Sequence, residues 1–125
     1  KTDDIVKSEL LRSQIYSKAA NFFQDYDALI LPAAQVPPFD HEVEWIQTIE
    51  GTKMETYIDW MTVCCAITVT GFPAISVPAG FTEEGLPVGL QIVGKPRGDV
   101  DLLRLAGAFE RETQYHKIQP KICAI

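Results

Sequence analysis

Few side chains in this sequence could act as nucleophiles, and their spacing limits the chemistry available to them. The chain contains no two adjacent serines and no two adjacent glycines. It therefore lacks a glycine-rich loop of the kind whose backbone N–H groups stabilise an oxyanion. Ser76 falls within an expected strand with no base near it in the sequence, so we interpret it as structural. The sequence predicts no catalytic residue in this chain.

The three cysteines, Cys64, Cys65 and Cys123, raise the alternative of a thiol hydrolase with His41 or His116 as its base. A reactive thiolate needs an accessible, electropositive site. The adjacent pair instead lies in an apolar stretch that we expect to be a buried helix, which predicts inert core cysteines. No Cys-x-x-Cys pair or Cys/His cluster has metal-ligand spacing, so we expect no metal and no cofactor. The odd count is a poor disulfide framework and favours a reducing, cytoplasmic compartment.

The candidates for ligand binding lie in and just after a long, proline-containing connection at 32–53. Trp45 is part of this connection, and Tyr57, Trp60 and Met61 follow it. Long connections in compact domains are often lids or binding loops. Pockets for small ligands are commonly lined by aromatic side chains with few polar groups. These four residues are therefore the candidate substrate-binding residues. The alternative is that they are core residues, with Trp45 anchoring a solvated loop.

The composition indicates one folded domain and limits its partners. Of the 125 residues, 46% are hydrophobic and 22% are charged, as is usual for a folded globular chain. The net charge of −6 argues against direct contact with nucleic acid, whose backbone is also negative. The most apolar stretch, 61–69, is shorter than the roughly 20 apolar residues that span a membrane. We therefore expect neither a nucleic acid nor a membrane as a direct partner.

Hydrophobic periodicity predicts an α/β domain. The expected helices span 5–24, 54–68 and 99–113, and the expected strands span 28–31, 74–78 and 88–93. The last two strands flank a turn that contains glycine and proline, so we expect them to pair in antiparallel fashion. Both strands are apolar on both faces, which predicts burial in the middle of a sheet. Gly107, inside the last expected helix, suggests a close packing contact, and residues 114–125 are expected to form a tail.

Three motifs, in this order, resemble those of the amidase signature family. Residues 26–32 (YDALILP) are similar to the family's "yDaLl-P" element, residues 70–80 (TGFPAISVPAG) to "tG-PaisvP-G", and residues 85–94 (GLPVGLQIVG) to "GLPvGlQivg". The resemblance covers about residues 12–113. It extends only to the C-terminal part of these much longer enzymes. We therefore interpret residues 1–125 as the C-terminal portion of an amidase-signature domain.

This resemblance implies a fold in which helices flank a mixed β-sheet. It also implies a parent enzyme that hydrolyses the C–N bond of a carboxylic amide. The family uses a serine nucleophile, a second serine in a cis peptide and a lysine base, which would all lie upstream of this chain. We therefore expect the chain alone to be inactive and the full-length parent to be active. In the family, the region before the second motif commonly supplies substrate contacts, which supports Trp45, Tyr57, Trp60 and Met61 as binding residues.

Two other functions stay open. One is a binding or scaffold module without catalysis. The other is a fragment of an amidotransferase A subunit, which hydrolyses glutamine and passes ammonia to a charged tRNA within a complex. The expected partners are a small-molecule amide and the remainder of the amidase chain, and a homo-oligomer stays open. Thr68 stands where the family often has asparagine, so the pocket beside it is a point of expected difference.

Overall fold

The computed structural model describes residues 1–119 of the chain; residues 120–125, which include Cys123, lie outside the described part. The helices are α1 (Thr2–Asp25), α2 (Thr62–Thr70) and α3 (Asp99–Thr113), with 3₁₀ turns η1 (Asp59–Met61) and η2 (Tyr115–Lys117). The strands are β1 (Leu29–Pro32), β2 (Thr48–Ile49), β3 (Thr52–Lys53), β4 (Ala74–Phe81) and β5 (Pro87–Val93). All three expected strands are present, as are the first and last expected helices.

A three-stranded sheet in the order β1-β5-β4 forms the centre of the fold. Both pairings are antiparallel, and Ile92 of β5 lies opposite both Ile30 of β1 and Ile75 of β4. The predicted antiparallel pairing of 74–78 with 88–93 is therefore confirmed. Strand β5 is central, which agrees with its two consecutive, almost fully buried residues at the end of the strand. A separate small hairpin, β2-β3, lies within the long connection.

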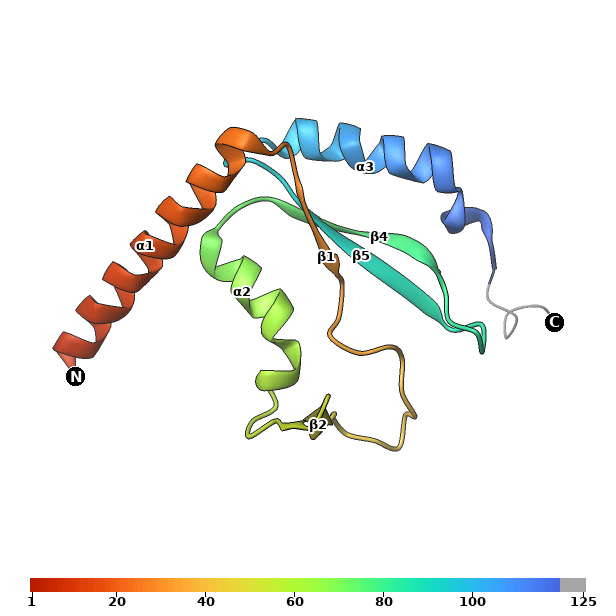
Figure 1. The fold of residues 1–125 in the computed structure, drawn as a ribbon, viewed down its shortest axis with the longest axis horizontal. Helices are drawn as coiled ribbons and strands as arrows, with labels where there is room; N and C mark the ends of the chain where they lie inside the picture. The colour runs from red at the N-terminus through yellow and green to blue at the C-terminus, as the bar shows by residue number, and fades with distance from the viewer. Residues whose placement is uncertain (120–125) are drawn as a thin grey trace.

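Helix α3 packs on one face of the sheet (Figure 1). Leu102 and Ala106 are buried there against Val77 of β4 and Ile92 of β5. These two helix residues are four apart, so they lie on the same side of the helix. Leu105, one residue before Ala106, is 40% exposed and lines a hollow beside Asp27 and Lys95.

The opposite face of the sheet is covered only in part, by the end of α1 and by α2. Phe23 of α1 and Ile67 of α2 pack with Phe72 and Val93 in a second buried cluster. This cover does not extend over β4, whose outward residues, including Ser76, are exposed. The prediction that β4 is buried on both faces is therefore wrong for the described residues. The alternating exposure shows that one face of β4 is largely open among residues 1–119.

The predicted helix over 54–68 is the main error in the element assignment. Residues 54–58 are not helical, and the helix begins only after the 3₁₀ turn η1. The apolar spacing was real, but it belongs to a connection whose side chains pack against one another and not to one face of a helix. The helix ends at Thr70, slightly beyond the predicted end, and Gly71 caps it with a φ of 70°, a conformation that glycine adopts without strain.

Helix α1 extends away from the sheet (Figure 1). Only its last part is anchored, by Phe23 and by an edge-to-face contact at 5.1 Å between the rings of Tyr16 and Phe72. The side chains of Ile5 and Leu11 are exposed along the preceding turns. The first half of α1 therefore presents apolar residues that nothing in residues 1–119 covers.

Candidate functional site

Three of the four candidate binding residues lie together in one aromatic cluster. The ring centroids of Trp45 and Tyr57 are 6.5 Å apart, and those of Tyr57 and Trp60 are 5.9 Å apart. Phe39 extends the cluster, with its ring 5.6 Å from that of Trp60. All three pairs are edge-to-face, the geometry that the ring quadrupoles favour. Sequence reasoning missed Phe39, although its position directly after two prolines in the long connection was an available signal.

An apolar hollow of about 270 Å³ adjoins Phe39 and Trp60. Its walls come from the segment after β1, from η1 and from the start of β5. The lining residues are Pro32, Ala33, Ala34, Val36, Pro37, Pro38, Phe39, Trp60, Pro87, Val88 and Gly89. None of these residues carries an ionisable side chain. We call this space the apolar hollow.

The walls of the apolar hollow are tied to the sheet and to α2 by three hydrogen bonds. The backbone N–H of Ala33 donates to the carbonyl oxygen of Gly89 at 3.0 Å. The thiol of Cys64 donates to the carbonyl oxygen of Ala33 at 3.2 Å. The side-chain oxygen of Gln35 accepts the backbone N–H of Val63 at the start of α2, at 2.9 Å. The loop that carries Phe39 is thereby fixed to both β5 and α2.

The turn that carries Trp60 is held by a carboxylate. One oxygen of Asp59 accepts the backbone N–H groups of Glu55 and Thr56, each at 2.8 Å. Hydrogen bonds from the backbone N–H and the hydroxyl of Thr56 lower the pKa of Asp59, because they stabilise its charged form. These two hydrogen bonds hold residues 55–59 in a turn immediately before Trp60, ahead of α2.

Two of the four candidates, Trp45 and Met61, do not line the apolar hollow. Trp45 lines a different space of about 300 Å³, beside the β2-β3 hairpin, together with Lys53 and Glu55. Met61 is half-buried at the N-cap of α2 and does not line the apolar hollow. Of the four candidates, Trp60 alone lines it, and Tyr57 supports Trp60 from the side.

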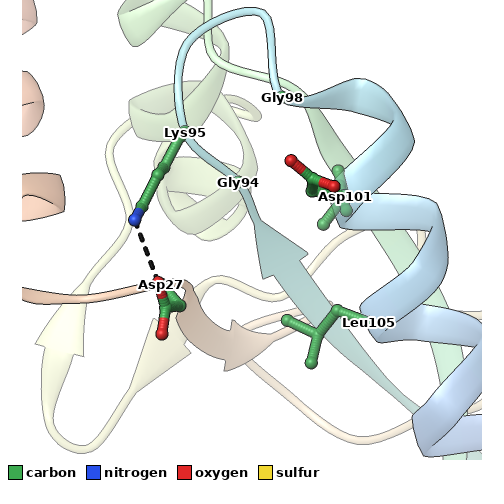
Figure 2. A pocket seen from close by; sticks show the side chains of 7 residues that line it. Asp27, Gly94, Lys95, Gly98, Asp101 and Leu105 are labelled. Atoms are coloured by element: carbon green, nitrogen blue, oxygen red, sulfur yellow. Dashed lines mark hydrogen bonds and ion pairs between the residues drawn. The ribbon is translucent and has the colours of Figure 1, made fainter.

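A second hollow, of about 250 Å³, is charged (Figure 2). Figure 2 shows the ammonium group of Lys95 directed at Asp27, with 2.9 Å between Nζ and Oδ1. Asp101, at the start of α3, pairs with Arg104 at 2.9 Å. Both carboxylates therefore already have a cation beside them. The Asp27–Lys95 pair joins the segment before β1 to the loop after β5, so we interpret it as structural.

Known proteins share both the sequence pattern and the fold of this chain. A family model described as Amidase matches residues 2–103. The chain belongs to the amidase signature family. The A subunit of a glutamyl-tRNA(Gln) amidotransferase from Dehalococcoides mccartyi is 40% identical over 119 residues, covering 94% of this chain and 23% of that protein. The corresponding protein from a Geobacter species is 39% identical over 111 residues, covering 89% of this chain and 22% of that protein.

Solved structures of the family have the same fold. A bacterial aryl acylamidase of the amidase signature family superposes with a TM-score of 0.79 at 27% identity, over 94% of this chain and 24% of that one. The A subunit of the glutamyl-tRNA(Gln) amidotransferase from Thermotoga maritima gives 0.69 at 31% identity, over 86% of this chain and 22% of that one. The chain thus spans less than a quarter of the length of the curated relatives named here.

Within this amidase-family chain, the side chains able to act as nucleophiles are not assembled into a catalytic site in the described residues. Ser76 is exposed on the uncovered face of β4. The imidazole of His41 lies beside Asp40 and Glu42 in an exposed loop, at 3.4 and 3.0 Å. Across residues 1–119, no three His, Cys, Asp or Glu side chains gather in a way that could hold a metal ion. In the same residues, no helix has the length and apolar character needed to cross a membrane.

The expectation of buried cysteines is wrong for both described thiols. Cys64 is exposed and Cys65 is half-buried. Helix α2 is short and turns only one side toward the α1–Phe72 cluster, so its other side remains open. Thr68, which departs from the family's usual asparagine, is also exposed, and its hydroxyl donates to the carbonyl oxygen of Cys64 at 3.0 Å. In this chain the threonine hydroxyl is thus used within its own helix.

Proposed function

We propose that this chain is the C-terminal portion of an amidase-signature enzyme that hydrolyses the C–N bond of a carboxylic amide. The match to the family over residues 2–103 supports this proposal most strongly. The fold supports it too, because the three family motifs lie in the core strands and their connections: β1, β4 and β5.

In this proposal the chemistry comes from residues outside the chain. A serine attacks the amide carbon after a lysine base takes its proton, the carbon becomes tetrahedral, and the C–N bond then breaks as the amine leaves with a proton. Water next hydrolyses the acyl-serine ester and restores the serine. This chain supplies the sheet that supports the site and part of the substrate-binding wall. Residues 1–125 by themselves are expected not to catalyse the reaction.

The aromatic cluster carries the binding part of the proposal. It places Trp45, Tyr57 and Trp60 in one connected set of rings, beside a hollow that has no ionisable lining residue. The proposed partners are a small-molecule amide and the rest of an amidase chain, in a reducing cytoplasm. A homo-oligomer is compatible with the exposed apolar side chains of α1.

A second candidate function is that of the A subunit of a tRNA-dependent amidotransferase, which would use glutamine as its amide. The observation that favours it is the 40% identity to that component of the glutamyl-tRNA(Gln) amidotransferase from Dehalococcoides mccartyi. A non-catalytic binding module is the remaining alternative.

The test compares the complete protein encoded by the gene with residues 1–125 alone. Each is assayed for ammonia or amine release from acetanilide, acetamide and glutamine. We expect the complete protein to hydrolyse at least one of these amides and residues 1–125 to release no more product than buffer. Turnover by residues 1–125 that is lost on Ser76→Ala would overturn the placement of the catalytic residues. No turnover by the complete protein on any of the three would favour the binding module.

A further inference from the structure

We draw no further inference here: the strongest candidate, the hollow on the open face of β4 that is lined in part by Cys64, Ser76 and Gln91, carries nothing because nothing in the structure shows what covers it.

Discussion

Two glycines provide a paired test of the packing in α3 and in β5. Gly107 lies within α3, and an added Cβ there would meet only Nη1 of Arg111, at 3.5 Å, the far end of a flexible side chain. The close packing contact suggested by the sequence is therefore absent among the described residues. Gly89 lies in β5, and its added Cβ would be 3.1 Å from the Cβ of Ala33 and 3.2 Å from Oγ of Ser76.

The expected effects have opposite signs. Gly107→Ala should raise the free energy of unfolding by about 1 kcal/mol, because alanine is the better helix former and nothing rigid in residues 1–119 opposes its methyl group. For a chain of this size that corresponds to a rise in Tm of about 4 °C. Gly89→Ala should lower the free energy of unfolding by about 1–3 kcal/mol, because β4 and the segment after β1, on either side of β5, must move apart.

The assay is urea unfolding of wild-type and variant proteins at the same sub-micromolar concentration, followed by tryptophan fluorescence. Both substitutions add one methyl group, so each serves as the other's control for the change in backbone entropy. A destabilising Gly107→Ala would refute the reasoning for α3, since it would require a rigid neighbour that residues 1–119 do not provide. A neutral Gly89→Ala would show that the sheet beneath the hollow is looser than its packing implies.

Further outcomes follow from the same structure. Hydrogen bonding lowers the pKa of Asp59 in the folded protein. The charged carboxylate therefore stabilises the fold fully above the unfolded-state pKa, and this stabilisation is lost as the pH falls through the folded-state pKa. The difference in free energy of unfolding between wild type and Asp59→Asn should shrink on acidification, as measured by urea midpoints across that pH range. In a Cys123→Ser background, exposed Cys64 should react with a thiol reagent faster than half-buried Cys65, and the opposite order, read by mass spectrometry, would contradict the described burial. Asp27→Ala should leave the unfolding midpoint nearly unchanged, because its carboxylate is 98% exposed in the ion pair with Lys95, whereas a large drop would show that the pair holds β1 in place. Residues 1–125 alone should self-associate through exposed apolar side chains such as Ile5 and Leu11, and a monodisperse monomer with a cooperative melt in sedimentation and calorimetry would contradict this.

The sequence predicted the strands well because their signals are local. Strands β4 and β5 are apolar runs on either side of a single turn that contains glycine, and such a turn favours pairing of the two strands that it joins. The helix over 54–68 was predicted wrongly because Met54, Tyr57 and Ile58 have helical spacing. In the structure, the carboxylate of Asp59 accepts two preceding backbone N–H groups and holds a turn before the helix. Spacing alone does not show whether apolar residues face a sheet or one another.

The site was partly predictable for the same reason. Aromatic residues in a long connection indicated a pocket, and Tyr57 and Trp60 do lie together in the cluster. The inclusion of Phe39, and the exclusion of Met61 from the hollow, depend on how the loop returns to β5, which is a tertiary contact. The exposure of Cys64 was also unpredictable from the sequence, because an apolar helix indicates burial but does not show which neighbours provide it.

The motifs that identify the family are also the residues that build the hollow. Pro32 ends the first motif, and Pro87, Val88 and Gly89 belong to the third; all four line the hollow. The hydrogen bond from Ala33 to Gly89 joins the end of the first motif to the third, at the point where the loop carrying Phe39 leaves the sheet. The shared sequence thus provides a rigid floor, while the aromatic side chains above it come from the connection that carries no family motif.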